Sequence, residues 1–256
     1  MRKLRREPLS EHATRILWKQ TVKIVEAGRS APSRSKLAKA RKDEARRLWR
    51  QKAGATFNEI RAALKEMAPG VERCMYCESN EGTDIEHFWP QKQAPCRAFD
   101  WSNLLLACSA CNSNHKRDRF PRKHGQPLLI NPTEDDPLDH LVLTPIGKFV
   151  PLTDKGENSI PVFGLDRGPL ERSRVIAWAA VDGLIVRYAN ACKRGDFASA
   201  LETQRALCEY PQVSVFAAIL RVAESRVAED FLSIYLSPEC RAALVAYPEI
   251  KSWLDG

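Results

Sequence analysis

Two pairs of cysteines with the spacing Cys-x-x-Cys lie in the middle of the chain. The first pair is Cys74 and Cys77, and the second pair is Cys108 and Cys111. Thiolates two residues apart can reach the same tetrahedral ion, and four thiolates fill the coordination shell of zinc. Because no position is then left for water or a substrate, the pattern predicts a structural zinc site rather than a catalytic one.

Polar residues suited to phosphodiester hydrolysis lie between the two pairs and directly after them. Such hydrolysis needs a base that takes a proton from water, and a divalent cation held by oxygen ligands. His87 can act as the base, because imidazole titrates near neutrality. Glu86 and Asn112 offer oxygens of the kind that Mg²⁺ or Mn²⁺ prefers. Asn103, also in this stretch, is a further candidate.

The stretch from Arg73 to Lys116 resembles the HNH endonuclease motif. The residues that carry the resemblance are "CMYC", "DIEHFWP" and "WSNLLLACSACNSNHK". They reproduce a first CxxC, an acidic-His pair followed by Pro, a middle Asn, and a second CxxC with Asn directly after it. The resemblance implies a ββα-metal finger, and it implies a metal-dependent endonuclease or nickase that acts on DNA with catalytic Mg²⁺ or Mn²⁺ beside the structural Zn²⁺.

The same resemblance implies a role for each matching residue. His87, on the first strand, would be the general base, and Glu86 would be a ligand of the catalytic metal. Asn103, in the connecting loop, would orient the His87 ring through a hydrogen bond. Asn112, at the start of the helix, would be the second metal ligand in place of the final His of the motif.

Three accessory residues complete the prediction. His115 is a rival to Asn112 as metal ligand, and Lys116 is a candidate contact for phosphate, with an exposed helix end as the alternative. Asp84 could fix the turn before the strand or bind a metal-bound water.

Two further stretches, "PLLINPTEDDP" and "FGLDRGPLERSR", extend the resemblance to a narrower group of bacterial HNH proteins. This group includes the nuclease subunit of Septu anti-phage systems and of retrons that use the same ATPase–nuclease pair. It implies a defence effector that works with an ATPase partner. The alternatives are an HNH protein of another defence system such as Zorya, action on RNA, and a zinc-stabilised nucleic-acid-binding module without catalysis.

The local patterns predict an α+β fold that is predominantly α-helical. Basic helices would occupy residues 1–70, the HNH finger residues 71–130, and a loop with a hairpin followed by a helical bundle residues 131–256. The strands of the finger would be "DIEHF" and "NLLLAC", and the later hairpin would turn near Ile146 and Gly147.

Charge is concentrated at one end of the chain. Residues 1–50 contain 16 Lys and Arg against five Asp and Glu, and the whole chain has a net charge of +8. DNA is the expected partner of such a segment, and a solvated helix face or an acidic protein surface is the alternative. No run approaches the length of a membrane span, and the N-terminus lacks the apolar core of a signal peptide, so we expect a cytoplasmic protein without membrane association.

Overall fold

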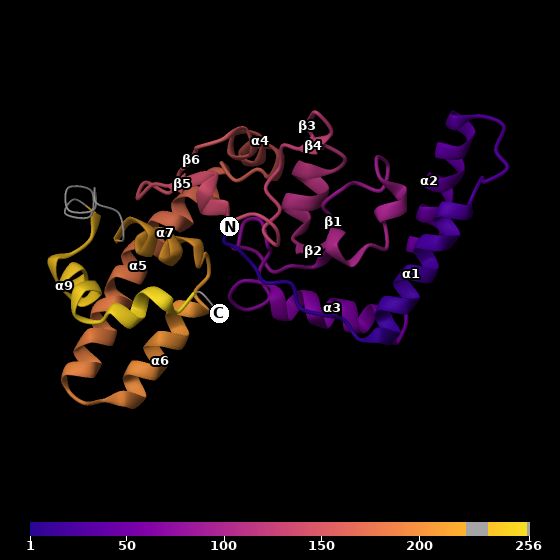
Figure 1. Ribbon diagram of the computed structural model, residues 1–256. Coiled ribbons are helices and arrows are strands. Elements are labelled where there is room, and N and C mark those ends of the chain that lie inside the picture. Colours follow the sequence, from indigo (N-terminus) through magenta and orange to yellow (C-terminus); the bar gives the residue numbers. More distant parts are fainter. Residues whose placement is uncertain (224–234, 255–256) are drawn as a thin grey trace.

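The computed structural model describes residues 1–223 and 235–254, and it confirms a predominantly helical α+β fold. Within these ranges the strands form three separate two-stranded antiparallel sheets. Helices α1 and α2 form an arm at one end, the cysteine-containing segment lies in the middle, and α5, α6, α7 and α9 gather at the other end (Figure 1). The helices are α1 (Glu11–Glu26), α2 (Arg34–Arg50), α3 (Ala55–Met67), α4 (Asp154–Phe163), α5 (Gly168–Lys193), α6 (Phe197–Cys208), α7 (Ser214–Ala223) and α9 (Pro238–Ala246).

The arm is built from two capped helices. The Ser10 hydroxyl accepts a hydrogen bond from the backbone N–H of Ala13, and the Ser33 hydroxyl does the same for Lys36, so each serine satisfies a free N–H of a first turn. Among the helices predicted for residues 1–70, α2 and α3 are separate, because Gly54 has a φ of 81° and starts α3 in a new direction. α2 packs against α1 and against η1 (Pro95–Arg97).

The middle of the chain forms the two strands that the motif predicts, but a π-helical segment stands in place of the predicted α-helix. Strand β1 (Asp84–His87) pairs antiparallel with β2 (Leu104–Ala107), with His87 opposite Leu104. After β2 the chain forms η3 (Ala110–Lys116), a π-helical segment in which the backbone N–H of Arg117 bonds the carbonyl of Asn112. A π-helical turn of this kind is uncommon and is frequent at functional sites.

The C-terminal part begins with the predicted hairpin of β5 (Leu141–Leu143) and β6 (Phe149–Pro151). Gly147 turns this hairpin with a φ of 79°, and a Cβ there would lie 2.0 Å from the carbonyl oxygen of Glu171. Helix α5 is long and apolar enough to cross a membrane by length and composition, contrary to the expectation from the sequence. It nevertheless packs against α6, α7 and α9, so within the structure it is the central helix of this bundle.

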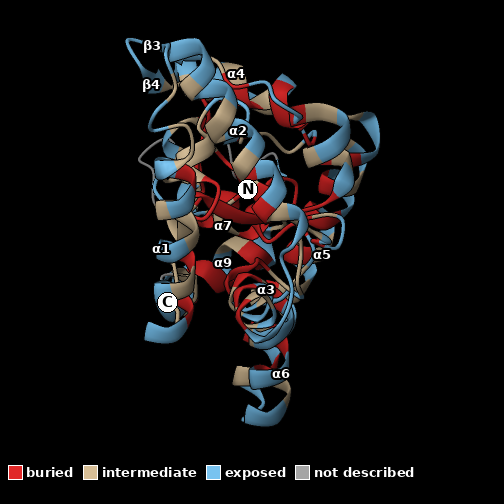
Figure 2. Ribbon diagram, turned by 90° about the vertical axis from the view of Figure 1, so that its right-hand side faces the viewer, coloured by how far each residue is buried: buried red, intermediate tan, exposed pale blue. Residues whose placement is uncertain are grey.

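Two clusters of buried apolar side chains hold these parts together. The first extends from Met1 through the cysteine pairs to Leu170, and the second joins α5, α6, α7 and α9. Buried residues gather in the middle of the molecule, whereas much of α2 is exposed (Figure 2). Arg174 lies between the clusters, 2% exposed, and donates to the carbonyls of Gly147 and Leu165.

The first nine residues run along the central segment and form part of its core. Met1 and Leu4 are buried, and the terminal amine of Met1 lies 3.2 Å from a carboxylate oxygen of Glu78. Arg6 donates to the backbone carbonyls of Trp101, Ser102 and Leu104 and to the Thr133 hydroxyl. Burial lowers the pKa of Arg6 to about 10. Part of the basic N-terminal segment therefore has a structural role, while α2 exposes most of its Lys and Arg side chains.

Substitution of Arg6 tests this structural role. Arg6→Gln should lower the free energy of unfolding by about 2 kcal/mol, because it removes charged hydrogen bonds to partly buried carbonyls. The matched control Arg5→Gln, at an exposed side chain, should change it by less than about 0.5 kcal/mol. Equilibrium unfolding in urea, followed by circular dichroism, measures both values, and equal effects of the two substitutions would contradict the structural role.

Candidate functional site

The four predicted zinc ligands converge on one point. The Sγ atoms of Cys74, Cys77, Cys108 and Cys111 all lie within 4.8 Å of one another, and all four residues are buried. Burial raises the pKa of the Cys74 thiol well above its usual value, so four thiolates at this place need a cation to offset their charge. Geometry and donor chemistry both fit a closed zinc site. In the described ranges no second cluster of three or more His, Cys, Asp or Glu ligands is found.

The last residue of α4 and the segment that follows it pack against this part of the structure. The guanidinium nitrogens of Arg167 lie 3.7 and 3.6 Å from the Sγ of Cys111, within the range of N–H···S hydrogen bonds. Phe163 stacks on Tyr76 with a ring separation of 3.9 Å. Gly164, with a φ of 62°, lets the ring of His115 approach so closely that a Cβ would lie 2.4 Å from its Nδ1. The stretch "FGLDRGP" therefore supports the zinc site, a role that sequence reasoning missed although it singled out the stretch.

Strand β1 divides the remaining candidates between its two faces. Alternation places Asp84 and Glu86 on one face, and Ile85 and His87 on the other. Glu86 is only 4% exposed, whereas Asp84 and His87 are half-buried.

Glu86 forms a buried ion pair with Lys116. The Lys116 ammonium lies 2.5 Å from a carboxylate oxygen of Glu86 and donates to the backbone carbonyl of His87 at 2.8 Å. Burial raises the pKa of Glu86 even though the lysine lies beside it. The structure thus differs from the prediction that Lys116 contacts phosphate, and from the alternative of an exposed helix end, because its side chain is fully buried. This ion pair joins η3 to β1.

Asp84 and Asn112 face each other across the gap between β1 and η3. The Asn112 amide nitrogen donates to the Asp84 carboxylate at 3.1 Å, and both residues are half-buried. A carboxylate and an amide oxygen are suitable ligands for Mg²⁺ or Mn²⁺. Because Lys116 already neutralises Glu86, Asp84 is the more accessible carboxylate on this face. His115 packs against Gly164, which favours Asn112 over His115 as a ligand.

The imidazole of His87 is held at the end of β1 by contacts from three segments. Its Nε2 lies 2.9 Å from the carbonyl of Ala98, and the Gln91 amide lies 3.3 Å from the same nitrogen. The Trp49 ring of α2 packs edge-on against it, with 4.2 Å between ring centroids. Burial lowers the pKa of His87 to about 4, so the ring is neutral at pH 7. With Nε2 donating to Ala98, the unprotonated nitrogen is Nδ1, as a general base requires.

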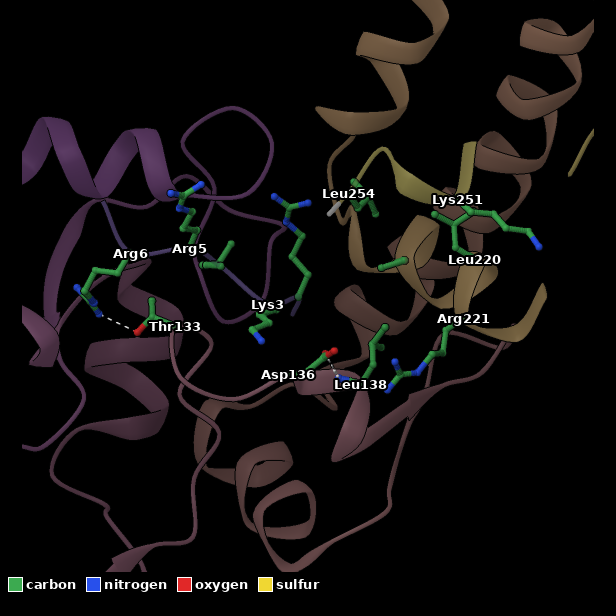
Figure 3. A pocket seen from close by; sticks show the side chains of 13 residues that line it. Lys3, Arg5, Arg6, Thr133, Asp136, Leu138, Leu220, Arg221, Lys251 and Leu254 are labelled. Carbon is green, nitrogen blue, oxygen red and sulfur yellow. Dashed lines mark hydrogen bonds between the residues drawn. The ribbon is translucent and has the colours of Figure 1, made fainter. Parts of the chain in front are cut away.

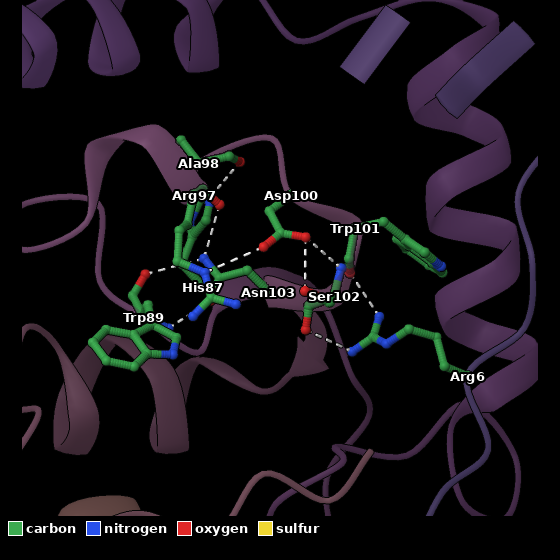
Figure 4. A network of polar contacts seen from close by, with 9 residues as sticks. All are labelled: Arg6, His87, Trp89, Arg97, Ala98, Asp100, Trp101, Ser102 and Asn103. Carbon is green, nitrogen blue, oxygen red and sulfur yellow. Dashed lines mark hydrogen bonds and ion pairs between the residues drawn. The ribbon is translucent and has the colours of Figure 1, made fainter. Parts of the chain in front are cut away.

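Asn103 acts on His87 through the backbone rather than through the ring. Its amide oxygen accepts from the N–H of Trp89 at 2.7 Å, and its amide nitrogen donates to the carbonyls of Trp89 and Arg97 (Figure 4). Arg97 directly precedes Ala98, whose carbonyl binds the imidazole. Asn103 therefore fixes the two segments that position His87, which corrects the predicted direct hydrogen bond between the two side chains. The contacts from Trp49 and Ala98 had no signal in the sequence.

Comparisons with known proteins agree with the resemblance seen in the motif. Residues 74–118 match the family model "HNH endonuclease", a range that contains both cysteine pairs, β1, β2 and η3. The chain is 33% identical over 147 residues to a protein of Bacillus mycoides (strain KBAB4) named Septu protein PtuB. This similarity covers 45% of the chain and 49% of that protein, so the chain spans about half the length of the curated relative. No solved structure matches the chain.

Zinc retention tests the support from Arg167. Arg167→Gln should speed the release of zinc to a chelator by about tenfold, because it removes the cationic donor to the Cys111 thiolate. The control Arg172→Gln is exposed and nearby in the chain, and should leave the rate unchanged. A colorimetric chelator assay measures the rate, and elemental analysis should find about one zinc per chain in both proteins. Release at the wild-type rate from Arg167→Gln would show that the contact does not stabilise the metal.

Proposed function

We propose that this protein is a metal-dependent HNH endonuclease or nickase that hydrolyses phosphodiester bonds of DNA. The observation that carries the proposal is a neutral, half-buried imidazole, His87, held on the strand that also carries Asp84 and Glu86, inside the segment that matches the HNH family model. A zinc ion held by the four cysteines, at the other end of the hairpin from His87, would fix the hairpin and η3 but would leave no open coordination position.

In the proposed mechanism His87 takes a proton from the attacking water. The lone pair of Nδ1 is free for this, because Nε2 donates to the Ala98 carbonyl and no hydrogen bond of Nδ1 is found among the described residues. Trp49 and Asn103 keep the ring and its backbone support in place. The water then attacks phosphorus in line with the leaving 3′-oxygen.

Asp84 and Asn112 would hold the catalytic Mg²⁺ or Mn²⁺, with Glu86 behind them on the same face of β1. When bound, such a cation neutralises the phosphate and stabilises the charge on the leaving oxygen. Glu86 remains a proposed ligand, but its ion pair with Lys116 competes with any second cation.

The similarity to a Septu protein supports a role in bacterial anti-phage defence. We propose that the protein works in the cytoplasm with an ATPase partner, as the resemblance implies. Residues 1–70, 71–130 and 131–256 would then serve as a basic arm, the catalytic finger and a helical extension available to the partner. A retron or Zorya-type system, or RNA as substrate, remains an alternative within the same chemistry.

Removal of the imidazole tests the catalytic proposal. His87→Ala should lower the rate of plasmid nicking in Mg²⁺ or Mn²⁺ by roughly 10²-fold or more, because the general base is lost. The matched control His124→Ala, at an exposed side chain, should keep the wild-type rate. Equal cleavage by His87→Ala and wild type would refute the assignment. If the wild-type protein binds DNA but does not cleave it in either metal, the alternative of a zinc-stabilised binding module is favoured.

The two carboxylates of β1 can be separated by metal titration. Asp84→Asn should raise the Mg²⁺ concentration for half-maximal cleavage by about tenfold or more, because it removes the charged ligand that faces Asn112. Glu86→Gln should mainly destabilise the protein, by about 3 kcal/mol or more, because it leaves the buried Lys116 without its counter-charge. Thermal unfolding and cleavage across a Mg²⁺ series give both values. The reverse pattern would assign the metal to Glu86.

A further inference from the structure

A basic groove lies between the first residues of the chain and the C-terminal helices, apart from the finger. It has a volume of about 690 Å³, in the range of small-molecule sites. Its walls come from four parts of the chain: residues 2–6, the segment 133–138, helix α7, and the residues around Lys251 (Figure 3). Neither His87 nor any predicted metal ligand lines it.

The charges on this groove are strongly unbalanced. Six cationic side chains line it, against one carboxylate, Asp136. An oxygen of Asp136 accepts a hydrogen bond from the backbone N–H of Leu138 at 2.9 Å, so this carboxylate caps η4 (Pro137–Asp139). The cationic residues are Arg2, Lys3, Arg5, Arg6, Arg221 and Lys251.

Two of the six cations are already engaged. Arg6 is bound to backbone carbonyls of the loop at Trp101, and Arg221 is paired with Asp139. The other four, Arg2, Lys3, Arg5 and Lys251, form no ion pair with any residue of the described ranges.

Arg2 has a further unmet requirement. Its Nε–H is buried and has no hydrogen-bond partner in the described part of the chain. An unsatisfied buried donor costs free energy. Four cations that line one groove without an ion pair in the described ranges therefore point to an anionic ligand.

We propose that this groove binds the phosphate groups of nucleotides, either in a nucleic-acid strand or in a free nucleoside triphosphate. Arginine supplies two of the four cations that have no ion pair in the described ranges, and its planar fork matches the geometry of phosphate oxygens. Leu138, Leu220 and Leu254 form an apolar part of the wall that suits a sugar or a base. Phosphate oxygens therefore meet the cations while the remainder of a nucleotide covers the leucines.

The groove is joined to the candidate catalytic residue through one chain segment. Arg6, on its wall, holds the carbonyls of Trp101 and Ser102 (Figure 4). It also donates to the carbonyl of Leu104. Asn103, in the same loop, fixes the backbone that positions His87. If the proposed nuclease function holds, a strand in the groove is bound beside the loop that supports the catalytic histidine. Phosphate binding itself does not depend on that function.

A charge-reversal pair tests the proposal. The variant Lys3→Glu/Arg5→Glu changes two exposed groove cations, and the control Lys193→Glu/Arg194→Glu makes the same change of charge at the exposed end of α5. The probe is a fluorescein-labelled 12-nucleotide single strand, measured by fluorescence anisotropy without added Mg²⁺ or Mn²⁺. The groove variant should raise Kd at least tenfold, and the control less than twofold. The slope of log K against log salt should fall by about 1.4 in the groove variant, since each lost phosphate contact contributes about 0.7 on a single strand.

Competition separates the sources of phosphate. Displacement of the probe by ATP at micromolar concentration would identify a free nucleotide as a ligand, and displacement only by unlabelled strand would identify nucleic acid. Hydrogen exchange of the complex should show protection at residues 2–6 and near Lys251. Tighter binding of poly-glutamate than of the strand would overturn the proposal in favour of an acidic protein partner.

Equal Kd values for the groove variant and the control would also overturn it. Circular dichroism checks that both variants fold. The milder variant Lys3→Gln/Arg5→Gln should have a Kd between that of the wild type and that of Lys3→Glu/Arg5→Glu. Plasmid cleavage by the wild-type protein in Mg²⁺ is measured separately. If the groove variant binds the strand more weakly than the control but the wild-type protein does not cleave, the nuclease function alone is refuted. If the wild-type protein cleaves but the groove variant and the control have equal Kd values, the groove proposal alone is refuted.

Discussion

The convergence of four buried thiols is the interaction on which the rest of the central segment depends. Cys74 and Cys77 lie before β1, and Cys108 and Cys111 lie at and after the end of β2, so a metal held by all four closes the hairpin at its open end. A two-stranded hairpin whose strands have four residues each is not stable alone in water. A zinc ion that brings these ends together would therefore fix where η3 begins and, with it, the position of Asn112 opposite Asp84.

A second constraint is the buried ion pair between Glu86 and Lys116. A lysine inside a protein loses its hydration, and it is stable there only with a partner and hydrogen bonds. Lys116 has both, because it binds Glu86 and the carbonyl of His87. The pair fixes the end of η3 against the strand that carries the imidazole, so the same charge that limits metal binding at Glu86 also orders the region around His87.

Segments far from the finger in the chain complete its surroundings. Trp49 from the basic arm packs on the His87 ring, Arg6 holds the loop at Trp101, and Arg167 donates to Cys111. The arm and the "FGLDRGP" stretch are thus parts of the central structure rather than appendages to it. Because Arg6 lies both in that support and on the wall of the basic groove, the two regions share one short chain segment.

The sequence by itself determined the local features. Cysteine spacing predicts the zinc cluster, and the local pattern of apolar residues predicts most helices. The motif places His87 on a strand and Asn112 in the following helical segment. All of these features depend on residues close together in the chain. Only the tertiary structure decided which side chains meet. It pairs Lys116 with Glu86, directs Asn103 to the backbone of Trp89 and Arg97, brings Asp84 to Asn112, and joins the N-terminal residues to α7 in a groove. These contacts join segments that are far apart in the chain, and they depend on how the segments pack and on which charges are buried together. The sequence of one segment alone does not specify them.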